Sequence, residues 1–436
     1  MSFPRYPTYK PSGVEWLGEV PGHWSVVGLG MRYRVDLGKM LDAKQITGEH
    51  LAPYLRNSDV QWGHIRTTDL PEMDFDAADR ERFGLIPGDL LVCEGGEVGR
   101  CAVWQGQIAE CYYQKALHRV RPAQPEIDAS AFLFWVLHAA AAAGTFEAGE
   151  SKATIAHLPA DAFRKYRFPF PPMADQRAIT AFLDRETARI DALVAEQERL
   201  IELLREKRQA VISHAVTKGL DPNVSMKDSG VKWLGEVPAH WGVIQSRRLF
   251  AVRSEPALPT DRMLTASQKY GVLFQSDFVE LEGRRVVEVI MGVESLKHVE
   301  PDDFIISMRS FQGGIEWCRL RGSTSFHYVM LKPIKHVHPP FFAHLLKSAT
   351  YIQALRTTTD LIRDGQELRF SNFTQVALPL VPMEEQASIA EFLDREIPKM
   401  DELITEATHA ITLLQERRSA LITAAVTGQI DVRGAA

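Results

Sequence analysis

The chain has 436 residues, of which 45% are hydrophobic and 24% are charged, and its formal net charge is −6. At roughly 100–200 residues per domain, this length predicts two to three globular units with enough apolar content for real cores. No run approaches the roughly 18 apolar residues that a membrane helix needs, and the four cysteines form neither a CxxC pair nor a zinc-like spacing. The acidic balance gives no indication of a nucleic-acid partner. Composition alone therefore predicts a soluble cytosolic protein with reduced thiols.

Two motifs occur twice in the chain. Residues 12–24 read SGVEWLGEVPGHW and residues 229–241 read SGVKWLGEVPAHW, so eleven of thirteen positions agree at an offset of 217. Further on, PMADQRAITAFLDRE at 172–186 matches PMEEQASIAEFLDRE at 382–396, at an offset of 210. The chain is therefore an internal duplication. Because the ends of the two halves match and the middles do not, the pattern predicts one scaffold that carries two different recognition surfaces.

The second motif of each half leads into a predicted long helix. Residues 174–218 contain neither proline nor glycine, and most are strong helix formers. In both copies, residues recur at spacings of three and four, which is typical of a coiled-coil seam. Gly219 and Gly428 mark the expected helix ends, and Pro398 predicts a new helix after a short one that ends near Glu396. The seam residues expected to pair are Ile190, Leu193, Leu200, Leu204 and Val211 in the first copy and Met400, Leu403, Leu414 and Leu421 in the second.

The simplest prediction is that the two long helices pair with each other, because an exposed apolar seam is not stable alone. Two alternatives stay open: each helix packs on its own domain, or the helices form a homodimer. A helix over residues 187–217 would span roughly 45 Å at 1.5 Å per residue, and it would act as a spacer of fixed length.

The two middle regions have the pattern of mixed α/β structure. Leu90–Val92 and Phe304–Ile306 each follow an aspartate and precede glycines, as strands that enter turns do. Residues 131–143 and 340–354 predict buried helices in corresponding places of the two halves.

No motif predicts catalysis or a metal site. The tetrapeptide at 338–341, HPPF, resembles that of amino-methyltransferases, but histidine is the wrong first residue and no glycine-rich nucleotide loop follows a strand upstream. The histidines form no HExxH motif and no metal cluster. The glycines at 95–99 and 313–314 follow predicted strands, where a turn is the favoured interpretation and a close backbone approach to a phosphate is the alternative. The chain is expected to be a binder.

Side chains suited to DNA contact cluster in both middle regions. Arginine, lysine, glutamine and asparagine can pair with base edges, and serine can bind phosphates. Each cluster alone is more typical of a solvated surface, but the recurrence in both middles favours DNA contact. The candidates are Arg56, Asn57, Gln61, Arg66, Gln114, Lys115 and Arg119 in the first middle, and Gln268, Lys269, Arg309, Ser310, Gln312, Arg363 and Gln366 in the second.

The paired SGV(E/K)WLGEVPxHW and PMxxQxxIxxFLDRE motifs resemble the specificity subunit of type I restriction–modification systems, over essentially the whole chain. The YLRN stretch at 54–57 and the DFIISMRSFQGGIEWC stretch at 303–318 also resemble members of this family.

The resemblance implies an α+β fold: two mixed α/β target-recognition domains, separated by two long antiparallel coiled-coil helices, in an internal pseudo-twofold repeat. The implied boundaries are 1–172 for the first domain, 173–221 for the first spacer-helix region, 222–382 for the second domain and 383–436 for the second spacer-helix region. Each domain would read one half of a split, asymmetric site in double-stranded DNA, and the helix length would set the gap.

The resemblance also implies a non-catalytic cytoplasmic subunit that directs its partners. Two methyltransferase subunits would bind along the helices, and motor–nuclease subunits would join that core to restrict unmodified DNA. The cofactors S-adenosylmethionine, ATP and magnesium would belong to those partners, and none to this chain. Two other classes stay open: a self-contained DNA-modifying enzyme, and a coiled-coil adaptor without sequence specificity.

Overall fold

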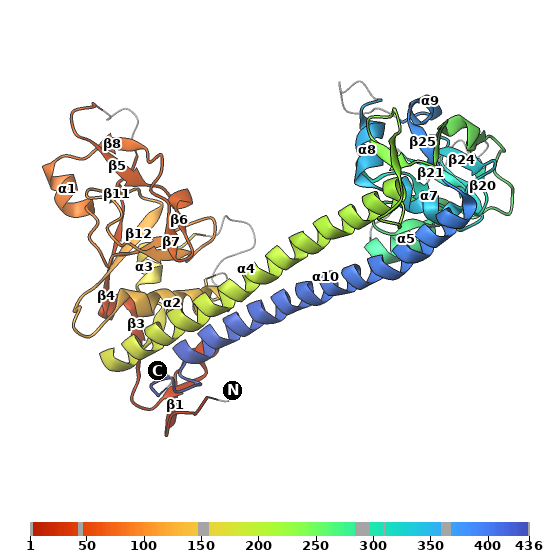
Figure 1. The fold of residues 1–436 in the computed structure, drawn as a ribbon. Helices are drawn as coiled ribbons and strands as arrows, with labels where there is room; N and C mark the ends of the chain where they lie inside the picture. The colour runs from red at the N-terminus through yellow and green to blue at the C-terminus, as the bar shows by residue number, and fades with distance from the viewer. Residues whose placement is uncertain are drawn as a thin grey trace. The chain divides into compact units, whose positions relative to one another are not determined.

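The computed structural model describes residues 3–41, 47–146, 157–283, 296–307, 310–358 and 368–434 (Figure 1). The chain divides into two compact units: unit 1 comprises residues 1–197 and 409–436, and unit 2 comprises residues 198–408. Each unit contains one copy of the opening motif, one middle region and a section of both long helices, α4 (Met173–Lys218) and α10 (Met383–Val426). The division runs through the two helices, and the domain boundaries expected from the sequence stay predictions.

Unit 1 contains a four-stranded antiparallel sheet in the order β10-β9-β12-β4. Helix α2 (Ser130–Ala142) contacts β9, β10 and β12 of this sheet. A second sheet has the order β11-β5-β8, with β5 parallel to β11 and antiparallel to β8. Short pairs join β1 to β2, β3 to β13 and β6 to β7. The bounds are β1 Tyr9–Pro11, β2 Glu19–Pro21, β3 Ser25–Gly28, β4 Tyr33–Leu37, β5 Leu51–Leu55, β6 Val60–Gln61, β7 His64–Ile65, β8 Glu72–Asp74, α1 Ala77–Phe83, β9 Leu90–Cys93, β10 Cys101–Val103, β11 Tyr112–Tyr113, β12 Leu117–Pro122, α3 Ala160–Phe163 and β13 Arg167–Phe170.

Unit 2 contains a four-stranded antiparallel sheet in the order β22-β21-β24-β17. This order corresponds to β10-β9-β12-β4 of unit 1 when the strands are taken along the chain. Short pairs join β14 to β15, β16 to β25, β18 to β19 and β20 to β23. The bounds are β14 Met226–Asp228, β15 Glu236–Pro238, β16 Gly242–Gln245, β17 Phe250–Arg253, β18 Leu264–Ser267, β19 Gly271–Phe274, α5 Gln275–Glu282, β20 Lys297–Val299, β21 Phe304–Ile306, α6 Ser310–Gly313, β22 Glu316–Trp317, β23 Gly322–Thr324, β24 Val329–Pro333, α7 Pro339–Leu345, α8 Ala349–Arg356, α9 Phe370–Gln375 and β25 Ala377–Leu380.

The two repeated motifs contact each other within each unit. In unit 1, Asp175 in the first turn of α4 accepts hydrogen bonds from His23 (2.8 Å) and from the indole of the fully buried Trp24 (3.4 Å). In unit 2, Glu385 in the first turn of α10 bonds His240 (2.5 Å) and accepts from the indole of Trp241 (2.9 Å). Each motif therefore supplies the hydrogen-bond partner of the other, which explains why the two motifs occur together in both halves.

A buried glutamine fixes the entry of each long helix. Gln176 donates to the Pro171 and Ile127 carbonyls (both 2.9 Å) and accepts from the Ala129 N–H (2.9 Å) at the start of α2. Gln386 makes the corresponding bonds in unit 2, to the carbonyls of Val381 and His336 and from the N–H of His338. Both side chains are almost fully buried, so loss of either amide would leave several backbone groups without hydrogen-bond partners.

The long helices pair in antiparallel fashion within each unit. Asp191 bonds Arg418 (2.9 Å) in unit 1, and Arg208 bonds Asp401 (2.9 Å) in unit 2. The second pair lies 17 residues later than the first on α4 (191 to 208) and 17 residues earlier on α10 (418 to 401). Both ion pairs therefore fit the same antiparallel register. These ion pairs are partly exposed and each contributes about 0–1 kcal/mol, so they specify register more than they stabilise the pairing.

The expected seam residues differ in exposure. Ile190, Leu204 and Met400 are at most 9% exposed. Val211, Leu414 and Leu421 are half-buried. Leu193, Leu200 and Leu403 are 39%, 42% and 47% exposed, so an apolar part of the helix surface stays accessible in each unit.

The expected helix break at Pro398 is wrong. Helix α10 runs without interruption from Met383 to Val426 with Pro398 inside it. A proline in a helix interior costs one backbone hydrogen bond and about 3 kcal/mol, but its neighbours Ile397 and Met400 are buried, and this burial offsets the cost. The helix expected over 340–354 is instead two helices, α7 and α8, because the Ser348 hydroxyl caps a new start by accepting from the Tyr351 N–H.

The C-terminal residues close unit 1 against the opening motif. The Asp431 N–H donates to the Pro4 carbonyl (2.8 Å), and Val432 is buried. Gly428 has a φ of +73°, and a Cβ there would lie 2.3 Å from Cδ of Pro21. Gly219 in unit 2 has a φ of +76°, but a Cβ there would lie 3.4 Å from the Trp241 ring and 3.8 Å from Cγ of Pro238, which are ordinary van der Waals distances.

We expect Gly428→Ala to destabilise the protein more than Gly219→Ala does. Both variants place an alanine in the left-handed region, which costs roughly 1–2 kcal/mol, but only the Gly428 variant adds a clash with Pro21. The additional loss in free energy of unfolding should be roughly 1–3 kcal/mol, the usual cost of overpacking. Denaturant unfolding of the two variants measures this difference, and equal losses would contradict the close contact with Pro21.

Candidate nucleic-acid interface

In unit 1, the predicted Arg56-Asn57 pair is tied to the glycine-rich turn after β9. The Asn57 amide donates to the Gly95 carbonyl (2.9 Å), and its oxygen accepts from Nη2 of Arg100 (3.0 Å). Arg56 forms a two-point ion pair with Asp59, with both N–O distances at 2.9 Å, and its side chain is 42% exposed. Arg100 was missed by the sequence analysis; its place one residue after the glycine run was the available signal.

The structure brings a second predicted cluster next to the first. The Gln114 N–H donates to the carbonyl of Leu55, the residue before Arg56, so Gln114 and Lys115 lie beside the Arg56 corner. Lys115 and Arg66 are exposed, and Gln61 bonds the Ser58 carbonyl (2.8 Å).

Arg119, which the sequence predicted to contact DNA, is buried instead. Only 7% of it is exposed, and its guanidinium donates to the Gly84 carbonyl (2.9 Å) and pairs with Asp36 (3.0 Å). These bonds tie the arginine into the interior of unit 1, where it holds neighbouring strands and loops together. It is therefore not placed to contact DNA.

A hollow of about 530 Å³ lies in unit 1 between the glycine-rich turn and α2. The Trp62 indole donates to Glu97 (2.6 Å), and its ring lies 4.9 Å from the ring of His138. Burial, and then the nearby Arg418, lower the pKa of His138, so this side chain is neutral at pH 7. The unit 1 hollow is therefore aromatic with one carboxylate.

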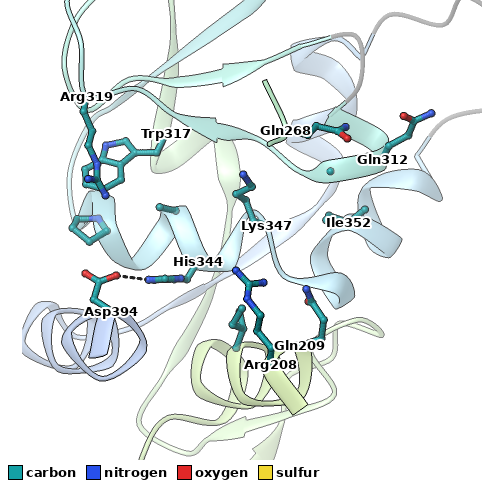
Figure 2. Close-up of a pocket in the computed structure, with 14 residues that line it drawn as sticks. Arg208, Gln209, Gln268, Gln312, Trp317, Arg319, His344, Lys347, Ile352 and Asp394 are labelled. Atoms are coloured by element: carbon teal, nitrogen blue, oxygen red, sulfur yellow. Dashed lines mark hydrogen bonds and ion pairs between the residues drawn. The ribbon is translucent and has the colours of Figure 1, made fainter. Parts of the chain in front are cut away.

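Unit 2 has a hollow of about 460 Å³ whose lining has a different chemistry (Figure 2). Amide and cationic side chains dominate it, together with one indole. His344 of α7 bonds Asp394 of α10 (2.8 Å) at its edge. The polar and aromatic lining residues are Arg208, Gln209, Gln268, Gln312, Trp317, Arg319, His344, Lys347 and Asp394.

The two hollows have corresponding neighbours on the long helices. Arg208 lines the unit 2 hollow, and Arg418, which lies 210 residues further along the chain, approaches His138 of the unit 1 hollow at 3.5 Å. In each unit, a helix of the middle region bonds an equivalent aspartate: Trp135 donates to Asp184 (3.0 Å) in unit 1, as His344 bonds Asp394 in unit 2. Equivalent scaffold positions therefore surround unlike linings.

The predicted residues of unit 2 are distributed between the hollow and its surroundings. Gln268 and Gln312 both line the hollow. Lys269 points to Glu282 (3.3 Å) instead, and Ser310 is buried, where its hydroxyl accepts from the Ser307 N–H (2.8 Å). Arg309, Arg363 and Gln366 lie outside the described residues. Trp317, Arg319 and Lys347 were missed, since single cations or indoles in a sequence give no sign of convergence.

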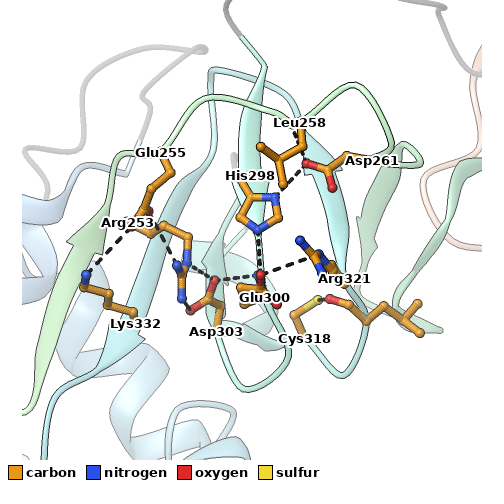
Figure 3. Close-up of polar contacts among 11 residues, drawn as sticks. Arg253, Glu255, Leu258, Asp261, His298, Glu300, Asp303, Cys318, Arg321 and Lys332 are labelled. Atoms are coloured by element: carbon orange, nitrogen blue, oxygen red, sulfur yellow. Dashed lines mark hydrogen bonds and ion pairs between the residues drawn. The ribbon is translucent and has the colours of Figure 1, made fainter.

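A polar network centred on the buried His298 lies in unit 2 (Figure 3). His298, only 7% exposed, bonds Asp261 through Nδ1 (2.6 Å) and Glu300 through Nε2 (2.8 Å). Burial opposes its charged form, but the hydrogen bonds to the two carboxylates outweigh burial and raise the pKa of His298. Asp303, just before β21, accepts two bonds from Arg253, as Asp89 does from Arg121 before β9 in unit 1.

Within the described ranges, no group of three or more histidine, cysteine, aspartate or glutamate side chains is arranged to hold a metal ion. None of the helices described is both long and apolar enough to cross a membrane.

Residues 34–203 match the family described as the type I restriction modification DNA specificity domain. The chain is 21% identical over 310 residues to the type I restriction enzyme EcoBI specificity subunit of Escherichia coli, a match that covers 66% of this chain and 63% of the relative. It is 24% identical over 230 residues to the EcoKI specificity subunit of Escherichia coli K12, covering 51% of this chain and 47% of the relative. The matches thus span less than two thirds of these relatives.

Two solved structures share the fold at 15% identity. One is a chain from a study of complex assembly and conformational transition of the type I R-M system, with a TM-score of 0.69 over 93% of this chain and 98% of that one. The other is the HsdS subunit from Thermoanaerobacter tengcongensis, with a TM-score of 0.56 over 94% of this chain and 98% of that one. The resemblance to type I specificity subunits, and the predicted fold of mixed domains on long antiparallel helices, are confirmed.

We expect His298→Gln to destabilise unit 2 in a pH-dependent way. The raised pKa means that the histidine contributes its full stability below its unfolded value of about 6.5, and that this contribution is lost as pH rises through the folded pKa. The difference from the unsubstituted protein should be roughly 1.5–3 kcal/mol at pH 5.5 and shrink towards pH 9. Thermal unfolding across this range measures the difference, with the exposed His64→Gln as control. A pH-independent difference would show that the imidazole is neutral between its carboxylates.

Proposed function

We propose that this chain is the DNA sequence-recognition subunit of a type I restriction–modification complex. The recognition domain of each unit reads one half of a bipartite, asymmetric site in double-stranded DNA, and the paired long helices set the gap. The observation that carries this proposal is the pair of unlike hollows at equivalent scaffold positions. A catalytic duplication would keep its reactive side chains in both copies, whereas a protein that reads two different half-sites must vary them.

The exposed apolar residues of the long helices support two identical partners. Leu193 and Leu413 are exposed in unit 1, and Leu403 and Leu203 are exposed in unit 2. Each unit 1 leucine has its equivalent in unit 2 at an offset of 210. Exposed leucines that recur in matched sets mark interaction surfaces. We assign one surface to each of two methyltransferase subunits, and motor–nuclease subunits join the resulting core.

The chain supplies recognition and no chemistry in this proposal. S-adenosylmethionine, ATP and magnesium bind to the methyltransferase and motor–nuclease subunits, and adenine methylation and restriction are performed there. The complex acts in the cytoplasm, where it meets the DNA that it modifies or cuts.

The function is tested by the methylation pattern that the chain directs. We expect co-expression with its methyltransferase partner in a methylation-free bacterium to give a split motif with methylated adenines in both halves, lost when this chain is omitted. Replacing residues 25–165 should change only one half-site, because the substitution leaves unit 2 intact. Methylome sequencing reads both outcomes. Methylation at unselected sites would favour the adaptor, and methylation by this chain alone would favour an enzyme.

The partner surfaces are tested by stoichiometry. We expect the double variant Leu193→Asp and Leu413→Asp to retain one methyltransferase subunit in place of two, because burying an unpaired carboxylate costs several kcal/mol. Adding Leu203→Asp and Leu403→Asp should abolish assembly. Native mass spectrometry of the co-expressed complex counts the subunits, and Leu258→Asp, at an exposed leucine away from the helices, serves as control. Two bound subunits in the quadruple variant would exclude these surfaces.

A further inference from the structure

Two adjacent glycines bring three segments of unit 2 into close contact. A Cβ at Gly313 would lie 2.5 Å from Cδ of Gln268. A Cβ at Gly314, whose φ is +86°, would lie 2.5 Å from the Leu346 carbonyl oxygen and 2.9 Å from Cα of Lys347. We call Gly313 and Gly314 the glycine junction. A side chain at Gly314 would meet backbone atoms, whereas a side chain at Gly313 would meet the Gln268 side chain.

The glycine junction brings three polar side chains to one hollow (Figure 2). Gln268 comes from the turn between β18 and β19, Gln312 from α6, and Lys347 from the turn between α7 and α8. The two glutamines are exposed, and the Gln268 amide packs against the residue that follows Gln312. Segments separated by up to 79 residues in the sequence (268 to 347) therefore present their polar groups together.

The surroundings hold these groups in place. The buried Ser310 hydroxyl fixes the start of α6 by accepting from the Ser307 N–H. Lys347 is paired with Glu316 (2.7 Å), a carboxylate that is only 5% exposed. The guanidinium of Arg319 lies over the Trp317 ring, 4.3 Å from its centroid. The cations at the hollow are thus positioned, and they are not freely mobile surface chains.

The chemistry of these groups matches one base. A glutamine amide offers one donor and one acceptor side by side, which complements N7 and the N6 amino group of adenine in the major groove. Guanine presents two acceptors there, so it would leave the amide oxygen unpaired. Lysine and arginine next to such amides suit the phosphates, which position a protein without reading sequence.

We propose that the glycine junction assembles the base-reading part of unit 2. The amides of Gln268 and Gln312 recognise adenine through its major-groove edge, and Arg319 and Lys347 contact neighbouring phosphates. This inference rests on the proposed function and names the residues that set specificity at the half-site of unit 2. Unit 1 has an indole, an imidazole and a carboxylate in its corresponding hollow, so its half-site is read by other groups.

The test is a set of single variants in the full complex with the methyltransferase subunits. Gln312→Ala and Gln268→Ala should each reduce discrimination for adenine by roughly 5- to 100-fold at a position of the unit 2 half-site. The other half-site, identified by replacing residues 25–165, should not change. Competition binding with duplexes substituted base by base measures this discrimination, and methylome sequencing checks it in the cell.

The Gly313→Ala variant tests whether the position of the Gln268 amide determines base recognition. The three atoms nearest to the added Cβ all belong to the flexible Gln268 side chain, so the fold should persist while the amide is displaced, and the variant should reproduce the relaxed specificity of Gln268→Ala. Arg319→Ala should weaken binding to all sequences alike and reduce the salt slope by about one. Gln375→Ala, an exposed glutamine of unit 2 that bonds the Ser371 carbonyl, should change nothing.

The outcomes distinguish this inference from the proposed function. A split motif in the unsubstituted complex, with unit 2 specificity unchanged in the Gln268, Gln312 and Gly313 variants, overturns the inference and leaves the function standing. Absence of any split motif in the unsubstituted complex overturns the function, and with it this inference. Relaxation at a guanine in place of adenine also overturns the base assignment.

Discussion

The fold of each unit depends on the contact between an opening-motif tryptophan and an acidic side chain in the first turn of a long helix. Asp175 and Glu385 bond the indoles of Trp24 and Trp241 while lying at the positive end of a helix dipole. The carboxylates therefore stabilise the helix start and also hold the opening motif against it. Since Gln176 and Gln386 fix the middle region to the same turn, three parts of each unit converge within two residues of the sequence.

This convergence explains how unlike surfaces can share one scaffold. Asp175, Gln176 and Gln386 are buried and hydrogen-bonded, so a change in any of these three would leave a polar atom unpaired at a cost of about 1–3 kcal/mol. Glu385 is half-buried, and its loss leaves the buried Trp241 indole without its partner. Part of each lining is free of such structural roles. Gln268 and Gln312 of the unit 2 hollow are exposed, whereas Lys347 pairs with the buried Glu316 of β22. Unit 1 has Trp62 and Glu97 in its hollow instead. Duplication followed by divergence then changes recognition without changing the architecture.

The sequence predicted the elements whose signal is local and periodic. The extent of α4 followed from a long run without proline or glycine, and the repeated motifs predicted two units on one scaffold. The predicted helix break at Pro398 was wrong, because burial of Ile397 and Met400 on either side of the proline outweighs its local helix-breaking effect. Arg119 misled for a related reason: an arginine on a strand can point to solvent or inward, and only the partners Asp36 and Gly84 decide which. The sequence could not predict that the polar side chains of the unit 2 hollow come together. Their approach depends on which segments of the fold can pack against Gly313 and Gly314.

The overall negative charge of the chain fits recognition by base edges better than recognition by charge. Three cations near the candidate contact residues are paired with carboxylates: Arg208 with Asp401, Lys347 with Glu316, and Arg56 with Asp59. A phosphate must compete with these carboxylates, which lowers the contribution of the three cations to binding of DNA of any sequence. Amides carry no charge and gain only where a complementary base edge is present. Under the proposed function, general DNA affinity would come from the partner subunits, and this chain would add discrimination, the quantity that separates one site from the many others in a genome.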